Sequence, residues 1–216
     1  AGYQLSSNWS GFMDLNLSNT LSSNPGTTDL PIIDNDADIV RGVTSLVLEN
    51  EHAKSSGAVK LFYNFGRHKI NDGYEEGEQP VPHRFHSTDH MMGASVHQSY
   101  LFFEGNKTTL GADYQRFGGS ASNRFPDESD DLSLADIQLY NVAGYLNVQQ
   151  TILNNRLTLN GGIRLDHHEI NGSEWIPQIG ASFIPTATTV IKAIVSKGFR
   201  NPTIREMYMF PPQNPD

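Results

Sequence analysis

Long runs of strict alternation between apolar and polar residues are the dominant feature of this sequence. In residues 3–17 one set of alternate positions carries apolar or small side chains and the other carries polar ones, with only Phe12 out of class. Successive side chains of a β-strand point to opposite faces, so this pattern predicts a strand with one apolar and one wet face. The alternation recurs and predicts about nine strands, near residues 2–18, 39–50, 57–70, 88–104, 108–119, 135–153, 156–170, 174–184 and 188–200.

Many of these strands would be about 12 to 17 residues long, whereas an ordinary strand has ~5–6. At about 3.3 Å per residue, a strand of about 13 residues reaches roughly 43 Å, well beyond the core of a small soluble domain. We find no convincing helix in the pattern. No stretch approaches the roughly 18 apolar residues of a membrane-spanning helix, which excludes helical membrane proteins but leaves transmembrane β-barrels.

The segments between the strands alternate between long and short, except that 171–173 is brief where a long loop is due. Residues 19–38, 71–87 and 120–134 are long and polar, whereas the links at 51–56, 105–107, 154–155 and 185–187 are brief. In an up-and-down meander alternate connections lie at the same end, so one end would carry long loops and the other tight turns. This asymmetry is typical of outer-membrane barrels.

We therefore predict an all-β, long-stranded antiparallel up-and-down meander that forms part of a larger transmembrane β-barrel. The alternative is a soluble all-β ligand-binding module of lipocalin-like type, with its apolar faces turned inward around a ligand.

The composition narrows the classes of function. Hydrophobic residues make up 37% of the chain and charged residues 18%, and the net charge is −9. A nucleic-acid-binding protein needs a basic surface, so this charge argues against nucleic acid as a partner. The chain has no Cys, which excludes disulfides and Cys-ligated metal. It starts at Ala1 without a signal-peptide pattern and apparently inside a strand, so we expect a fragment.

Two segments near the end of the chain carry a specific pattern. Residues 157–170 (LTLNGGIRLDHHEI) contain Gly-x-Arg-x-Asp. Residues 174–209 contain Pro-x-x-Gly-x-x-x-x-Pro, a Lys-containing strand, and then Ser-x-Gly-Phe-Arg-x-Pro-x-x-x-Glu-x-Tyr. Together they resemble the barrel of TonB-dependent outer-membrane receptors. The family-signature positions are Arg164, Asp166, Pro177, Gly180, Pro185, Lys192, Ser196, Gly198, Phe199, Arg200, Pro202, Glu206 and Tyr208.

The resemblance implies a transmembrane barrel of 22 strands in the outer membrane of a Gram-negative bacterium. It implies uptake of a scarce ligand, most simply a ferric siderophore or another metal chelate, with cobalamin, haem or copper as alternatives. The implied partners are lipid, a plug domain of the same full-length chain, and TonB acting through that plug. Residues 1–216 would then be a partial barrel domain, without the plug and the C-terminal strands. As an isolated piece it would be an open curved sheet, or it would oligomerise through its two free edges.

The sequence offers few candidates for chemistry. It has no nucleophile elbow, phosphate loop or His-Glu-x-x-His motif, so we expect neither an enzyme nor a cofactor, and we predict no metal site. His167 and His168 are neighbours on a strand and would point to opposite faces. Charged residues of the wet face, such as Asp113 and Arg164, are expected to pair with one another or with the plug. We expect the ligand contact to be a stretch of soft ligands in an extracellular loop: His83, His86, His90, Met91 and Met92.

Overall fold

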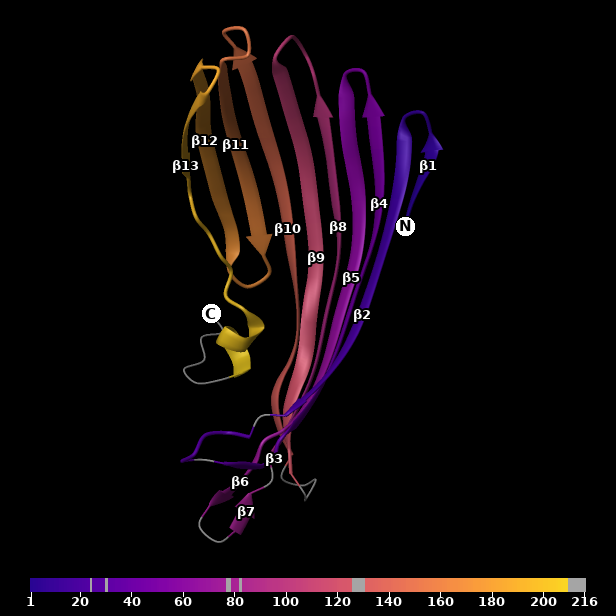
Figure 1. Cartoon of the computed structure of the whole chain (residues 1–216), viewed down its shortest axis with the longest axis vertical. Helices are drawn as coiled ribbons and strands as arrows, with labels where there is room; N and C mark the ends of the chain where they lie inside the picture. The colour runs from indigo at the N-terminus through magenta and orange to yellow at the C-terminus, as the bar shows by residue number, and fades with distance from the viewer. Residues whose placement is uncertain (24, 30, 77–78, 82, 126–130, 210–216) are drawn as a thin grey trace.

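The computed structural model describes residues 1–23, 25–29, 31–76, 79–81, 83–125 and 131–209. Ten strands form a single sheet in the order β1-β2-β4-β5-β8-β9-β10-β11-β12-β13. Figure 1 shows them side by side, with a smaller sheet in the order β3-β6-β7 beyond one end. The strands of the large sheet are β1 (Gly2–Ser6), β2 (Trp9–Ser23), β4 (Asp36–His52), β5 (Ser55–Asn71), β8 (Arg84–Tyr100), β9 (Asn106–Arg124), β10 (Leu132–Ile152), β11 (Leu157–His168), β12 (Gly172–Thr186) and β13 (Thr189–Ser196).

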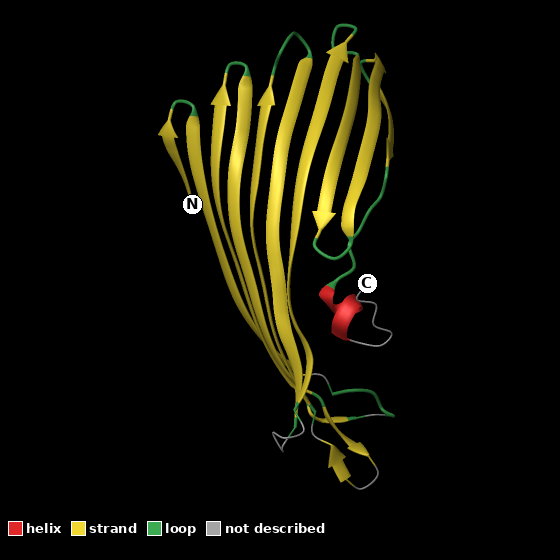
Figure 2. Cartoon of the chain, turned by 180° about the vertical axis from the view of Figure 1, so that it is seen from behind, coloured by secondary structure: helices red, strands yellow, loops and turns green. Residues whose placement is uncertain are grey.

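The predicted up-and-down meander is confirmed. Neighbouring strands of the large sheet pair antiparallel throughout. Five tight turns lie together at one end. The longer connections, with β3 (Ile32–Asp34), β6 (Gly73–Glu76) and β7 (Gln79–Val81), lie towards the other, as does the brief link between β11 and β12 (Figure 2). We call these the turn end and the loop end.

The prediction of one strand over residues 2–18 is wrong, because these residues belong to a hairpin formed by β1 and β2. Ser7 and Asn8 form its turn, and a register irregularity lies between Gln4 and Ser6. Tyr3 and Gly11 are directly paired across the hairpin, so the odd-numbered residues of β1 and β2 share a face. The alternation therefore continues across the turn without a change of phase, and periodicity cannot detect it.

Three other expectations need correction at the loop end. The strands of the large sheet extend into the segments predicted to be loops. Within the predicted loops 19–38 and 71–87, β3, β6 and β7 form the three-stranded sheet. In contrast, β13 ends at Ser196, four residues earlier than predicted. After it comes a short π-helical turn, η2 (Arg205–Met209), where the alternation predicts no helix. Its side chain Met207 is 1% exposed, and η2 lies against β10.

The two faces of the large sheet differ sharply. One face, which we call the outward face, carries exposed apolar side chains such as Leu46, Leu61, Leu110, Leu146 and Ile179. The register places these residues on the same side of successive strands. From Val59 to Leu61 on β5, and at the equivalent positions of the described strands beside it, this face carries no Asp, Glu, Lys or Arg. The opposite, inward face carries the polar and charged residues.

The exposed apolar residues of the outward face form a band, which we call the apolar band. It runs obliquely across the strands. Through the register, the last apolar outward residue of β2, Leu21, is level with Lys69 of β5, whereas Trp175 of β12 is level with Val59. The boundary thus shifts by ten residues over seven strand-to-strand steps. With a rise of ~3.3 Å per residue and strands ~4.8 Å apart, the strands are tilted by roughly 45° to the band. Transmembrane β-strands are tilted by about this amount.

The sheet is open. β1 and β13 are its edges, and among the described residues they are not paired with each other. An open sheet with its apolar face uncovered gives no support to the lipocalin-like alternative, in which that face encloses a ligand. No helix in the described part of the chain is long and apolar enough to cross a membrane.

Candidate functional site

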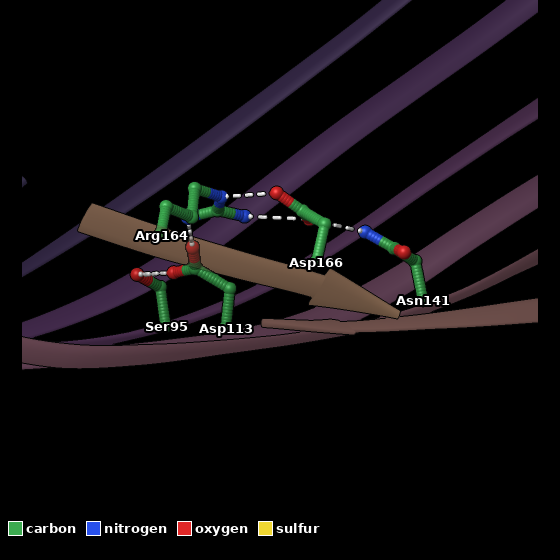
Figure 3. A network of polar contacts seen from close by, with 5 residues as sticks. All are labelled: Ser95, Asp113, Asn141, Arg164 and Asp166. Carbon is green, nitrogen blue, oxygen red and sulfur yellow. Dashed lines mark hydrogen bonds and ion pairs between the residues drawn. The ribbon is translucent and has the colours of Figure 1, made fainter. Parts of the chain in front are cut away.

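A network of charged side chains crosses the inward face at the level of the apolar band. Arg164 on β11 donates to Asp166 on the same strand (Nε to Oδ2, 2.6 Å) and to Asp113 on β9 (Nη1 to Oδ2, 2.5 Å). Ser95 donates to the other oxygen of Asp113 at 2.7 Å, and the Asn141 amide donates to Asp166 at 3.1 Å. Figure 3 shows the five side chains joined across β8, β9, β10 and β11. Of Lys60, Asp113, Arg164, Lys192 and Arg200, which were expected to pair with one another or with the plug, Asp113 and Arg164 pair with each other.

The guanidinium of Arg164 also contacts an aromatic ring, that of Tyr145. It lies 5.7 Å from the ring centroid of Tyr145, within the range of a cation–π contact. The Tyr145 ring lies directly over Gly111, where a Cβ atom would be only 2.2 Å from Cζ. With its carboxylate partners on two strands and the ring beside it, Arg164 fixes the relative position of β9, β10 and β11. We assign this network to stability rather than to ligand binding.

A pocket at the loop end of the inward face is the better candidate for a ligand. Its volume is about 630 Å³, and it lies between the inward residues of β4 to β10 and the turn η2. Among its lining side chains are Arg41, His68, His83, Asp89 and Arg205. We call it the loop-end pocket. Another hollow, of about 520 Å³, is lined mainly by apolar residues of β10 to β13 and does not suit a charged ligand.

Arg41 is the organising residue of the loop-end pocket. Its Nη1 donates to Asp89 Oδ2 at 2.7 Å, and its Nη2 lies 2.8 Å from Nε2 of His68. These contacts join β4, β5 and β8 on the inward face. The Arg41 side chain remains 47% exposed, so it can approach a ligand without breaking the sheet. Asp72 and His83 close the same end, because the Asp72 amide donates to the His83 carbonyl at 2.8 Å.

The family-signature stretch after β13 forms one wall of the loop-end pocket. Arg200 donates through both terminal nitrogens to the Glu206 carboxylate, each at 3.0 Å. The amide and hydroxyl of Thr203 donate to the same carboxylate at 2.7 and 3.0 Å. We call these hydrogen bonds among Arg200, Thr203 and Glu206 the clasp. The clasp folds the chain back after Pro202 and positions η2, whose Arg205 and Met209 line the pocket.

We predict that the clasp survives mild acid. Hydrogen bonds from Arg200, and then from Thr203, lower the pKa of Glu206 to about 2 from its ordinary value of 4.5. Because folding lowers this pKa, the carboxylate's stabilising effect is complete above pH 4.5 and is lost as the pH falls from 4.5 towards about 2. Hydrogen-exchange protection of the Met207 amide, which donates to Thr203 at 3.0 Å, should follow this course.

The Glu206→Gln variant is the control for the clasp, and its Met207 protection should be weaker and independent of pH over this range. If protection in the unmodified chain were already half lost at pH 4.5, the carboxylate would be titrating normally and the clasp would not form.

The soft-ligand stretch does not lie in a loop, and the structure separates its residues. Four of them lie in β8, where the register places His86, His90 and Met92 on the outward face and Met91 on the inward face. His83 precedes β8 and lines the loop-end pocket. The predicted strand at 88–104 begins four residues later than β8, because polar residues occupy both faces of β8 beyond the apolar band. Among the described residues no group of His, Cys, Asp and Glu has the geometry of a metal site.

The other signature residues lie on the last two strands or just after them. Pro177 of β12 is paired with Ile163 of β11, while Gly198, Phe199 and Pro202 follow β13 without regular structure. Tyr208 belongs to η2. The sequence pattern did not single out Arg41 and His68. Both are polar residues at inward positions near the loop end of long strands. A search of the sequence for such residues could have identified them.

His167 and His168 point to opposite faces, as predicted: His167 is paired with outward Val142 and His168 with inward Asn141. His168 is 1% exposed, and its Nδ1 accepts from the amides of Ile170 and Asn171, each at 3.3 Å. It therefore shapes the link between β11 and β12.

Comparison with known proteins gives a family and a fold. A family model described as TonB dependent receptor-like, beta-barrel matches residues 1–216. No curated protein sequence matches the chain significantly. A mutant of the ferric enterobactin receptor PfeA from Pseudomonas aeruginosa is similar in structure, with a TM-score of 0.72 and 14% identity over 95% of this chain and 33% of that chain.

BauA, the ferric preacinetobactin receptor from Acinetobacter baumannii, is also similar, with a TM-score of 0.59 and 11% identity over 89% of this chain and 38% of that chain. The chain thus spans little more than a third of the length of these receptors. At such identities the likeness shows a shared fold.

Proposed function

This chain belongs to the TonB-dependent receptor β-barrel family, and from that membership we propose that it forms part of the wall of a receptor that takes up a ferric siderophore or another metal chelate. Members of the family are outer-membrane β-barrels and transport receptors. The structural neighbours PfeA and BauA are receptors for ferric enterobactin and ferric preacinetobactin. We extend that class of ligand, and not either compound, to this chain.

The observation that carries the proposal is the loop-end pocket. It opens at the end where the long connections lie, and it places the side chains of Arg41, His68 and Arg205 around one space. Many metal chelates carry negative charge on oxygen donors, and a guanidinium binds such groups with directed, charge-assisted hydrogen bonds. The Asp89 carboxylate holds Arg41 in place at 2.7 Å.

The proposed activity is binding followed by gated transport. The pocket and the long connections would capture the chelate at the outer surface, while a plug domain of the full-length chain would close the lumen. TonB, acting through that plug, would supply the energy that opens a path. No step changes the bonds of the ligand, so the protein would be a transporter and not an enzyme.

The test is a titration of the intact receptor with ferric chelates, followed by changes to the pocket. We expect Arg41→Gln to weaken binding by about tenfold, because it removes a charged hydrogen-bond donor that is partly exposed to water. His83→Ala should also weaken binding. His86→Ala is the matched control, since His86 lies outward on the same stretch and should leave the affinity unchanged.

Lys192→Gln is a second control, because it removes a positive charge from the inward face away from the pocket. Equal losses for His83→Ala and His86→Ala would contradict the placement of the site. The proposed function itself would be contradicted if the intact receptor bound no ferric chelate, cobalamin or haem at any concentration at which the ligand stays soluble.

A further inference from the structure

The contact between His68 and Arg41 in the loop-end pocket fixes the protonation state of the imidazole ring. Nη2 of Arg41 lies 2.8 Å from Nε2 of His68. A guanidinium keeps all of its protons in a protein and can only donate, so Nε2 accepts this hydrogen bond and carries no proton. The proton of the neutral ring is then on Nδ1. The ring can therefore gain a second proton only on Nε2, the same atom that accepts from Arg41.

Gly66 brings Arg41 within reach of both of its partners. Arg41 on β4 and Asp89 on β8 are each paired with Gly66 of β5. A Cβ atom on Gly66 would lie only 2.5 Å from Nη1 of Arg41 and from Oδ1 of Asp89. The guanidinium therefore crosses β5 directly over Gly66 and reaches His68, which follows two residues later on the same face. A guanidinium has five N–H groups, so donors remain for a ligand in the pocket.

The environment of His68 keeps its ring neutral while the pocket holds no anion. Given the oblique offset of the apolar band, its boundary crosses β5 before His68, which lies beyond the band towards the loop end. Burial, and then the charge of Arg41, lower the pKa of His68 below its ordinary value of 6.5, whereas the charge of Asp89 raises it. The described charged and titratable groups that share the pocket with His68 come from β4, β8, η2 and the segments next to β5 and β8: Arg41, Asp72, His83, Asp89 and Arg205.

We propose that an anionic oxygen group binds at Arg41 and that its binding is coupled to the uptake of one proton by Nε2 of His68. In the proposed function, on which this inference rests, that group belongs to the chelate. A negative charge close to an imidazole favours the imidazolium ion. The proton comes from solvent, and no covalent bond of the ligand changes.

Protonation would change the direction of the hydrogen bonds in the pocket. An Nε2 that carries a proton cannot accept from Arg41, and it donates to the anionic oxygen instead. Before binding, Arg41 is the partner of Asp89 and His68. After binding, Arg41 and His68 would both face the ligand as cations, and charge-assisted hydrogen bonds of this kind are the strong ones.

The pH dependence of binding follows from this coupling. The bound anion raises the pKa of His68 above its value in the free pocket. Binding therefore strengthens as the pH falls from the bound value to the free value, and it does not change with pH outside that interval. Because the free value lies below 6.5, the interval begins below pH 6.5 and extends upwards as far as the anion raises the pKa. With one proton involved, the affinity changes by up to about tenfold per pH unit within the interval.

The first experiment counts protons during binding to the intact receptor in discs of neutral lipid. Ferric enterobactin, ferric preacinetobactin and ferric citrate are titrated by calorimetry between about pH 6 and 8, the range in which histidine changes charge. Each titration is repeated in a second buffer with a different ionisation enthalpy, because the difference in heat gives the number of protons taken up. His68→Gln is the test variant, since Gln can still accept from Arg41 but cannot gain a proton.

His83→Ala is the matched control, because it removes another histidine that lines the pocket and whose ring contacts Phe125. We expect the unmodified receptor to bind a ferric chelate about tenfold more tightly near pH 6 than near pH 8, relative to His68→Gln at each pH. The calorimetric difference should approach one proton, and His68→Gln should lose that proton. His83→Ala should keep the pH dependence of the unmodified receptor, even where its affinity is lower.

A second experiment needs no chelate. The pKa of His68 is followed by NMR on the intact receptor labelled in its imidazole rings, and the His68 signal is identified by its loss in His68→Gln. Pyrophosphate, a simple oxygen anion, should raise this pKa in the unmodified receptor and much less in Arg41→Gln. Without pyrophosphate, Arg41→Gln should itself raise the pKa of His68, because a neighbouring positive charge has been removed.

The inference is overturned if a ferric chelate binds to His68→Gln with the same pH dependence and proton count as to the unmodified receptor. It is also overturned if pyrophosphate leaves the pKa of His68 unchanged. If none of the three chelates binds while pyrophosphate raises that pKa through Arg41, the proposed function fails and the proton-linked anion site stands.

Discussion

Replacing Leu146 with Arg is expected to lower the free energy of unfolding in a bilayer by about 2–4 kcal/mol. Leu146 lies in the middle of the apolar band on β10, between Leu110 of β9 and Ile163 of β11, and all three point outward. The guanidinium would have to lie in hydrocarbon or draw water and headgroups towards it. The measurement is a denaturant titration of the intact receptor reconstituted in lipid.

The matched control for this substitution is its neighbour. Asn147 is at the same depth, but it points inward and is paired with Thr109 and Gly162. Asn147→Arg should change the free energy of unfolding by less than about 1 kcal/mol, as polar surface substitutions do. Equal effects at the two positions would show that the apolar face does not contact lipid. That outcome would remove the basis for the transport proposal.

The second large effect is expected at the centre of the inward face. Arg164→Met should lower the free energy of unfolding by about 2 kcal/mol. Breaking a fully buried ion pair costs about 3–5 kcal/mol, but a third of the Arg164 side chain is exposed, so water screens part of the loss. The variant leaves two carboxylates, Asp113 and Asp166, close together without their shared cation.

Two further variants show whether the loss comes from the uncompensated carboxylates. R164M/D113N/D166N should recover most of the stability, because it removes the charges along with their partner. Arg41→Met breaks an ion pair of 2.7 Å on the same face, but both of its side chains are nearly half exposed, so its effect should stay below about 1 kcal/mol. An unchanged free energy for Arg164→Met would show that the network does not brace the strands.

The architecture could be predicted because strand alternation reports directly on the two faces of a sheet. Residues 59–65, for example, alternate except at Phe62, and β5 (Ser55–Asn71) agrees closely with the predicted strand at 57–70. The signature motif coincides with the turn that borders the pocket, where Pro202 and Glu206 determine local backbone geometry. Both are properties of neighbouring residues, and a sequence displays them plainly.

The rest could not be predicted, because it depends on pairs that are distant in the chain. Arg41 and Asp89 are 48 residues apart, and only the register of three strands brings them together. The His-rich stretch shows the opposite error. Its residues are close in sequence, but strand geometry sends His86 and Met91 to opposite faces.

The constant offset of the apolar band from strand to strand has an evolutionary consequence. Each added hairpin advances the band by the same amount, so a wall of this kind can gain or lose hairpins without changing how the neighbouring strands sit in the membrane. Insertion of a single residue within a strand would instead exchange the two faces of everything beyond it up to the next turn. Changes in the number of strands should therefore be tolerated more readily than changes in the length of one strand by a single residue, and the hairpin is the natural unit by which such a barrel can grow or shrink.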